Sequence, residues 1–157
     1  MDPQAEELGR RLAEKRQFLA VAESCTGGLI AKRVTDIAGS SGWFERGLVV
    51  YSNQAKQDLL GISVDLLAQF GAVSRECAEA MARGLLVMTP AHWAIAVTGI
   101  AGPGGGSPEK PVGLVWIAWE GRGGKVESEL LQLAGSREQI RVAAAQAALT
   151  GLLKRLG

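Results

Sequence analysis

The chain has 157 residues, of which 47% are hydrophobic, and this predicts one domain over residues 1–157 with a core of its own. Its 17 Lys and Arg residues nearly balance its 16 Asp and Glu residues, and a net charge of +1 argues against nucleic acid or an anionic membrane as a partner. No apolar run is long enough to span a bilayer, and the acidic, polar N-terminus is not a signal peptide, so we expect a cytoplasmic protein.

Helical and strand patterns alternate over most of the chain. Apolar residues at helical spacing, or a serine placed to cap the segment, predict helices at residues 5–16, 29–37, 53–60, 64–69, 75–88 and from 137 to about 155. Short apolar or alternating runs predict strands at residues 18–22, 46–51, 93–97, 112–119 and 125–133. We expect the strand at 46–51 to be buried, because it contains a Leu-Val-Val run. This order, with a hairpin late in the chain, predicts a three-layer α/β domain with a mixed sheet.

The segment Ala22–Gly28, Ala-Glu-Ser-Cys-Thr-Gly-Gly, joins the first predicted strand to the helix that follows. Ser24 would thus lie where backbone N–H groups lack partners and the helix dipole favours negative charge. Such a place suits a nucleophile whose attack creates an oxyanion, with Thr26, Gly27 and Gly28 supplying the N–H donors for an oxyanion or another anion. An ordinary helix N-cap explains the same residues, and Ser24 alone does not decide between the two.

A nucleophilic serine needs a base, and the chain has one histidine, His92. His92 precedes a strand, which makes a Ser-His-Asp triad improbable. Lys56 lies in the block Tyr51–Lys56, after the second predicted strand, and ligands of open α/β sheets bind at the carboxyl ends of strands. A desolvated lysine with a lowered pKa can replace histidine as base, and Tyr51 and Asn53 belong to the same block. Composition alone favours a solvated Lys56 and a half-buried Tyr51.

A glycine-rich loop, Thr98–Ser107, follows the third predicted strand at the same edge of the sheet. Its exposed N–H groups can form an anion-binding nest, although its spacing matches neither a Walker loop nor a dinucleotide fingerprint. The alternative is a surface turn, but a loop of this length is more often functional. We expect substrate contacts from five of its residues: Thr98, Gly99, Gly102, Gly104 and Gly105.

Two arginines open the last predicted helix. Arg137 and Arg141 are four residues apart, so they lie on one helix face and can clamp a phosphate or carboxylate of the substrate. For a single arginine, a solvated charged face is the commoner case.

Cys25 is a rival nucleophile, because a thiol near a helix N-terminus can be acidified. Cys25, Cys77 and His92 match no metal-binding spacing, so we expect free thiols, no metal and no cofactor.

Taken together, these motifs resemble the CinA C-terminal domain family. The resemblance covers nearly the whole chain in ordered blocks: Ala22–Gly28, Asp36–Ser41, Tyr51–Asn53, Gly71–Ser74, Thr98–Gly105 and Lys110–Gly113. One departure is that relatives often carry Asp after the proline of the glycine loop, where this chain has Gly104. We expect that change to alter the dynamics of the loop rather than the chemistry.

The resemblance implies an α/β/α sandwich with a five-stranded mixed sheet of the anticodon-binding-like type. Stand-alone members are nicotinamide-nucleotide amidases, which implies hydrolysis of the carboxamide of nicotinamide mononucleotide to nicotinic acid mononucleotide and ammonia, a step of pyridine nucleotide recycling. By motif, Ser24 is then the nucleophile and Lys56 the base, and Tyr51 assists proton transfer or orients Lys56.

The alternative function is a non-catalytic nucleotide-binding or regulatory module, since the family is associated with competence and DNA damage. Such a module would use the same anion sites without requiring Ser24 or Lys56. In either case the expected partner is a small nucleotide, and exposed apolar strands and tryptophans are compatible with a homodimer.

Overall fold

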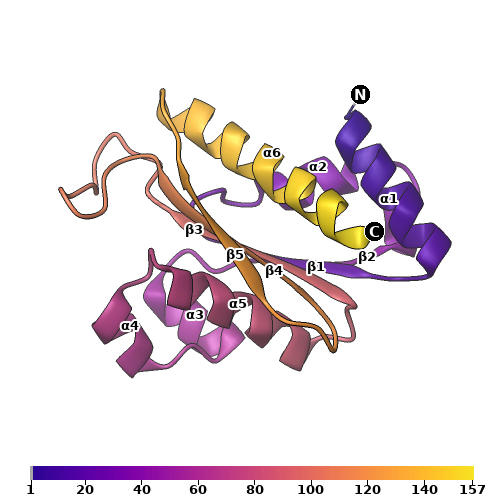
Figure 1. Ribbon diagram of the computed structural model, residues 1–157, viewed down its shortest axis with the longest axis horizontal. Coiled ribbons are helices and arrows are strands. Elements are labelled where there is room, and N and C mark those ends of the chain that lie inside the picture. Colours follow the sequence, from indigo (N-terminus) through magenta and orange to yellow (C-terminus); the bar gives the residue numbers. More distant parts are fainter. Residues whose placement is uncertain (1) are drawn as a thin grey trace.

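The computed structural model describes residues 2–157, which form one mixed sheet between two layers of helices (Figure 1). The strands are β1 (Leu19–Glu23), β2 (Phe44–Val49), β3 (Trp93–Gly99), β4 (Leu114–Gly121) and β5 (Glu127–Gln132). Their order across the sheet is β2-β1-β3-β4-β5. β1 runs parallel to β2 and β3, whereas the β3–β4 and β4–β5 pairs are antiparallel. The predicted mixed sheet and its late hairpin are therefore confirmed.

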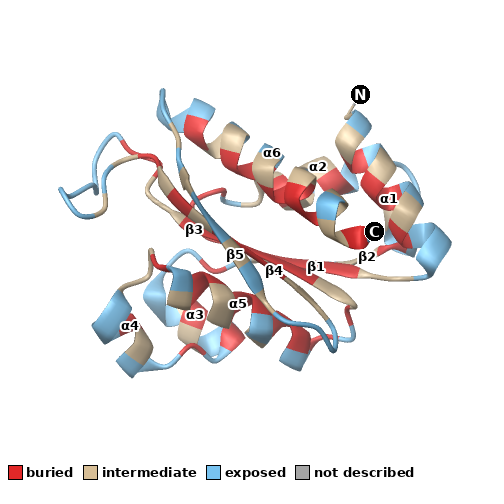
Figure 2. Cartoon of the chain, viewed as in Figure 1, coloured by how far each residue is buried: buried red, intermediate tan, exposed pale blue. Residues whose placement is uncertain are grey.

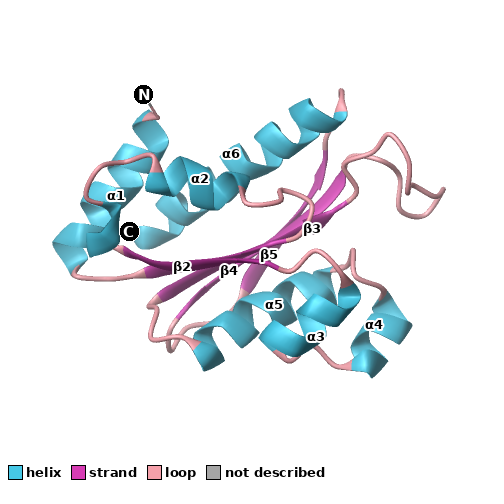
Figure 3. Cartoon of the chain, turned by 180° about the vertical axis from the view of Figure 1, so that it is seen from behind, coloured by secondary structure: helices cyan, strands magenta, loops and turns pink. Residues whose placement is uncertain are grey.

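Three helices cover each face of the sheet, as Figure 3 shows from behind. One layer contains α1 (Pro3–Lys15), α2 (Leu29–Thr35) and α6 (Arg137–Leu156). The other contains α3 (Asn53–Leu60), α4 (Val64–Phe70) and α5 (Arg75–Met88), and a short 3-10 helix at Ser40–Gly42 precedes β2. None of these helices is long and apolar enough to cross a membrane.

Serine side chains fix where several helices begin. Ser52, Ser74 and Ser136 each accept a hydrogen bond from the backbone N–H three residues later, at the starts of α3, α5 and α6. Each serine thereby satisfies one of the N–H groups that a helix N-terminus leaves unpaired. The three helix starts predicted from these serines are confirmed.

The two faces of the sheet carry side chains of different size. On the face toward α5 the central strands present alanines: Ala20, Ala22, Ala94, Ala96 and Ala118. On the face toward α6 they present larger residues: Leu19, Val21, Ile95, Val97, Val115, Ile117 and Trp119. All of these residues are buried, as the red strands in Figure 2 show, because the central strands are covered on both sides.

The prediction that the second strand is buried is wrong. β2 covers Phe44–Val49 rather than residues 46–51, and all its residues are intermediate or exposed, with Val49 48% exposed. The reason is its position, since β2 pairs only with β1 and forms one edge of the sheet. The apolar run continues past the strand into Val50, which is buried.

Trp119 on β4 anchors α6 to the sheet, and Gly151 permits this contact. The indole Nε1 donates to the carbonyl of Ala148 at 2.9 Å, and a Cβ on Gly151 would lie 2.1 Å from indole Cζ2. We expect Gly151→Ala to lower the free energy of unfolding by about 1–3 kcal/mol through overpacking. This loss would occur although alanine is the better helix former by ~1 kcal/mol.

Urea unfolding measures the effect, with Gly104→Ala as the control. No atom lies within 4 Å of a Cβ built on Gly104, so the control should change stability by less than about 0.5 kcal/mol. If Gly151→Ala were as stable as Gly104→Ala, the close packing of Trp119 against Gly151 would be contradicted.

Candidate active site

The carboxyl ends of β1 and β3 and the segment after β2 surround a small cavity. Because these strands are parallel, their ends meet at one edge of the sheet. The cavity has a volume of about 220 Å³. Its lining contains seven of the residues predicted from sequence, namely Ser24, Tyr51, Asn53, Lys56, Thr98, Gly99 and Arg137.

Lys56 and Ser24 meet at the floor of this cavity. Lys56 Nζ lies 3.1 Å from Ser24 Oγ, and the two residues are only 1% and 8% exposed. Lys56 Nζ also donates to the carbonyls of Val50 at 2.9 Å and Tyr51 at 3.1 Å. A neutral amine has two N–H groups and one lone pair, so these carbonyls can take both N–H groups and leave the lone pair for the hydroxyl of Ser24.

Burial lowers the pKa of Lys56, because the ammonium form loses its hydration inside the protein. The nearby thiols of Cys77 and Cys25 act in the opposite direction, with a smaller effect. The neutral amine, which can accept a proton from Ser24, is therefore more populated than in a solvated lysine. The surface-lysine alternative is wrong for this residue.

The hydroxyl of Tyr51 bonds to Arg137 and not to Ser24 or Lys56. Tyr51 is 59% exposed, and its hydroxyl accepts a hydrogen bond from Arg137 Nη2 at 3.1 Å. The backbone carbonyl of Tyr51 contacts Lys56 instead. Orientation of Lys56, which we expected from Tyr51, thus has a structural basis in the main chain rather than in the phenol.

Ser24 is not a helix cap, because α2 begins five residues later with Gly28 as its N-cap. The N-terminus of α2 is not open to an anion either. Glu23, 1% exposed, places its carboxylate there, with Oε1 2.9 Å from the N–H of Ile30 and Oε2 3.0 Å from the N–H of Ala31. Sequence reasoning missed this role of Glu23, since nothing in the pattern shows that its side chain folds back onto the next helix.

Two N–H groups near this turn have partners. Gly27 N–H donates to the carbonyl of Ser24 and Leu29 N–H to that of Thr26, both at 3.1 Å. Within the part of the chain that the structure describes, the N–H groups of Cys25, Thr26 and Gly28 donate to no protein acceptor. Of these residues, Cys25 lines the cavity and Thr26 is completely buried. Gly27, expected to bind an anion, has its N–H occupied.

The two arginines predicted to act as one clamp have separate contacts. Arg137 lines the cavity and donates from Nη1 to the carbonyl of Gly102 at 2.7 Å. Arg141 lies outside the lining and donates to the carbonyls of Cys25, from Nε at 3.1 Å, and Thr26, from Nη2 at 3.0 Å. One turn of α6 therefore divides them between the cavity and the Ser24–Gly28 turn.

The glycine loop contributes its first residues to the cavity and not its tip. Thr98 Oγ1 donates to the carbonyl of Ala72 at 2.9 Å, which holds the cavity wall together. Gly99 lies against β4, where a Cβ would meet Val115 at 2.7 Å. Gly102, Gly104 and Gly105 are all outside the lining, so the structure does not bring them to the predicted site. Gly102 is buried, whereas Gly104 and Gly105 are exposed.

Neither rival catalytic group fits. Burial raises the pKa of the Cys25 thiol to about 11, so the expected acidification does not occur. His92 lies at the start of β3, at the other end of the strand from Thr98, and its Nδ1 accepts a hydrogen bond from Phe18 N–H at 2.9 Å. Among residues 2–157, no group of three or more His, Cys, Asp or Glu side chains could hold a metal ion.

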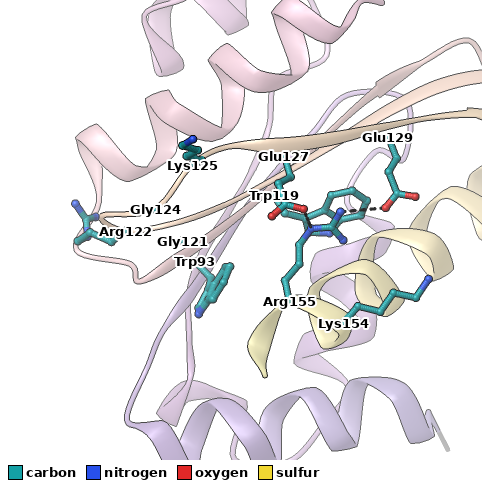
Figure 4. A pocket seen from close by; sticks show the side chains of 10 residues that line it. All are labelled: Trp93, Trp119, Gly121, Arg122, Gly124, Lys125, Glu127, Glu129, Lys154 and Arg155. Atoms are coloured by element: carbon teal, nitrogen blue, oxygen red, sulfur yellow. Dashed lines mark hydrogen bonds and ion pairs between the residues drawn. The ribbon is translucent and has the colours of Figure 1, made fainter.

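A larger cavity, of about 600 Å³, lies between α6 and the β4–β5 hairpin (Figure 4). One of the charged groups in its lining, Arg155, is already paired, because it bonds to Glu127 and Glu129 at 3.1 Å each. The Arg155 guanidinium also lies 4.0 Å from the ring centre of Trp119. This cavity contains none of the nucleophiles considered above, so size alone does not identify the active site.

Comparisons with known proteins show which family the chain belongs to. A family model of the CinA C-terminal domain matches residues 1–156. The chain is 51% identical over 148 residues to the nicotinamide-nucleotide amidohydrolase PncC of Enterobacter agglomerans, a match that covers 94% of this chain and 90% of that protein. It is also 51% identical over 142 residues to a CinA-like protein of Akkermansia muciniphila, of which it spans 34%, and 90% of this chain is covered.

A solved structure shows the same fold. The competence/damage inducible protein CihA of Agrobacterium tumefaciens superposes with a TM-score of 0.90 at 48% sequence identity, over 96% of this chain and 94% of that one. The expected five-stranded α/β architecture is therefore confirmed by both sheet and superposition. On the sequence match over nearly its full length, the chain belongs to the CinA C-terminal domain family.

Proposed function

We propose that this protein hydrolyses the carboxamide of nicotinamide mononucleotide, giving nicotinic acid mononucleotide and ammonia, with Ser24 as nucleophile and Lys56 as base. The observation that carries the proposal is the buried contact of 3.1 Å between Lys56 Nζ and Ser24 Oγ. Curated relatives that match over nearly the full chain bear the name nicotinamide-nucleotide amidohydrolase.

The first half of the reaction forms an acyl-enzyme. Lys56 takes the Ser24 proton as Oγ bonds to the carboxamide carbon, which yields a tetrahedral oxyanion. When that intermediate collapses, the C–N bond breaks and the Lys56 ammonium returns the proton to the leaving nitrogen, which departs as ammonia. In the second half, Lys56 takes a proton from water, the hydroxide displaces Ser24, and the proton returns to Oγ.

Unpaired N–H groups of the Ser24–Gly28 turn stabilise the oxyanion. A backbone donor of this kind contributes roughly 3 kcal/mol in comparable sites. The N–H of Cys25 is the best placed of the three, because Cys25 lines the cavity and follows the nucleophile directly. This assignment replaces the donors expected from sequence, since the Gly27 N–H is occupied, Thr26 is completely buried and Gly28 does not line the cavity.

The cavity accommodates the pyridine carboxamide, and the ribose phosphate extends from its mouth. Its volume of about 220 Å³ is too small for a whole nucleotide. Arg137 lines that cavity and supplies the guanidinium for the phosphate, and exposed Asn53 supplies an amide beside it.

A non-catalytic nucleotide-binding module is the weaker alternative. Binding needs the cavity and Arg137, but it does not need a lysine buried to 1% exposure against a serine. Burying an amine costs free energy of folding, and perturbed ionisable groups of this kind are typical of catalytic sites. Ammonia release from nicotinamide mononucleotide separates the two functions.

Ser24→Ala and Lys56→Met should each lower the rate of ammonia release by about 10³-fold or more, because each removes a partner of the proton transfer. Both variants should stay folded, and Lys56→Met retains the buried stem without the amine. Cys25→Ala should keep most of the activity. An ammonia assay on the purified proteins, with melting curves for folding, decides the matter: near-normal turnover by either of the first two variants refutes the mechanism.

The rate should rise with pH through the pKa of Lys56. Only the neutral amine accepts the Ser24 proton, and burial places that pKa below the ordinary value for lysine. The profile of kcat/KM from about pH 6 to about pH 10 should therefore show one rising limb that levels off before free lysine would titrate. A profile that falls over this range would exclude Lys56 as the base.

A further inference from the structure

We propose that Arg141 is a positioning residue, which holds the peptide units after the nucleophile so that the N–H of Cys25 stays available to the oxyanion. The inference rests on the function proposed above. It departs from the expectation that Arg141 clamps the substrate, because both of its hydrogen-bonded nitrogens are used on carbonyls of the Ser24–Gly28 turn.

The planarity of the peptide bond links each of these carbonyls to the N–H of the next residue, which is Thr26 for the Cys25 carbonyl and Gly27 for the Thr26 carbonyl. In a trans peptide the C=O and the N–H of one unit point in opposite directions. Arg141 holds the carbonyls of Cys25 and Thr26, so it fixes the orientation of two consecutive units after Ser24. The unit before them is fixed as well, because the carbonyl of Ser24 accepts from Gly27 N–H at 3.1 Å. The N–H of Cys25 belongs to that unit and points away from the interior of the turn.

The guanidinium is fitted closely to the turn. A Cβ on Gly27, where φ is +57°, would lie 2.9 Å from Arg141 Nη2, so a larger residue there would displace the guanidinium. A planar guanidinium reaches the two neighbouring carbonyls from separate nitrogens of a rigid group, whereas a lysine at position 141 would have to reach both from one nitrogen on a shorter side chain. A cation on the carbonyl side of a peptide unit also polarises it, so Arg141 strengthens the Gly27 N–H as the donor that holds the Ser24 carbonyl.

Glu23 fixes the turn from the other end. Its buried carboxylate bonds to the N–H groups of Ile30 and Ala31, and its backbone is held in the sheet, where Val50 N–H donates to the Glu23 carbonyl at 2.8 Å. The turn is thus anchored by an anion on its helix side and by the Arg141 cation on its carbonyl side. Neither group lines the cavity, so both act through the turn rather than on the substrate.

Steady-state kinetics with two substrates tests the inference. Arg141→Met should lower kcat by about 10–100-fold with KM within about twofold, because the lost stabilisation concerns the transition state. The factor should be the same for nicotinamide mononucleotide and for nicotinamide riboside, which lacks the phosphate. Arg141→Lys should not restore kcat.

Arg137→Met is the contrasting variant, since Arg137 lines the cavity. It should raise KM for the mononucleotide far more than for the riboside. Lys154→Met is the matched control, because it removes an exposed positive charge from the distant end of the same helix. It should leave both constants unchanged.

Several outcomes overturn the inference. A raised KM for the mononucleotide alone, with kcat unchanged, would show that Arg141 binds the phosphate. Unchanged kcat and KM would show that the turn does not need it. Absence of ammonia from the wild-type protein would instead refute the proposed function, and this inference with it. Melting curves accompany each variant, and Arg141→Lys gives the same readout if Arg141→Met does not fold.

Discussion

The active-site geometry depends on one energetically unfavourable placement. The amine of Lys56 is buried against the hydroxyl of Ser24 at the carboxyl ends of the parallel strands. Lys56 loses its hydration there, and the carbonyls of Val50 and Tyr51 offset only part of that loss, so its pKa falls. Ser24 follows the last residue of β1 directly, and the cap at Ser52 sets the start of the helix that carries Lys56. The rest of the fold stabilises the domain enough to tolerate this local cost.

Sequence patterns predicted the sheet, most helix starts and the location of Ser24 and Lys56 at the same ends of the strands, because these follow from local rules. The contact between Ser24 and Lys56 is known only from the structure. Strand periodicity, serine caps and the meeting of parallel strand ends are all readable along the chain. The contacts that were not predicted join distant parts of the chain. Arg141 meets Cys25 across 116 positions, and Arg137 meets Tyr51 across 86. Helical spacing correctly placed both arginines near one another but did not show that one turn would send them to different partners.

Burial also reversed the pKa shift that the local sequence predicts for Cys25. A thiol near a helix N-terminus is ordinarily acidified, yet burial raises the pKa of Cys25. The helix end that would have acidified it is occupied by the Glu23 carboxylate. In this site, positive charge therefore comes from side chains rather than from the helix dipole. The burial of β2 was mispredicted for a comparable reason, since an apolar strand pattern does not show which strand lies at the outer edge of the sheet.

The size of the side chains on each face of the sheet limits which substitutions the helical layer on that face tolerates. The layer with α6 packs on large side chains, which can exchange volume with their neighbours. The layer with α3 and α5 packs on alanines. Replacing one of these alanines with a larger residue would push that layer outward, and only glycine is smaller. Because α3, which carries Lys56, packs on α5, the distance from its amine to Ser24 depends on how closely α5 lies on these alanines. Substitutions should therefore accumulate more slowly at these alanines than at the large residues of the opposite face, although none of either set lines the cavity at Ser24.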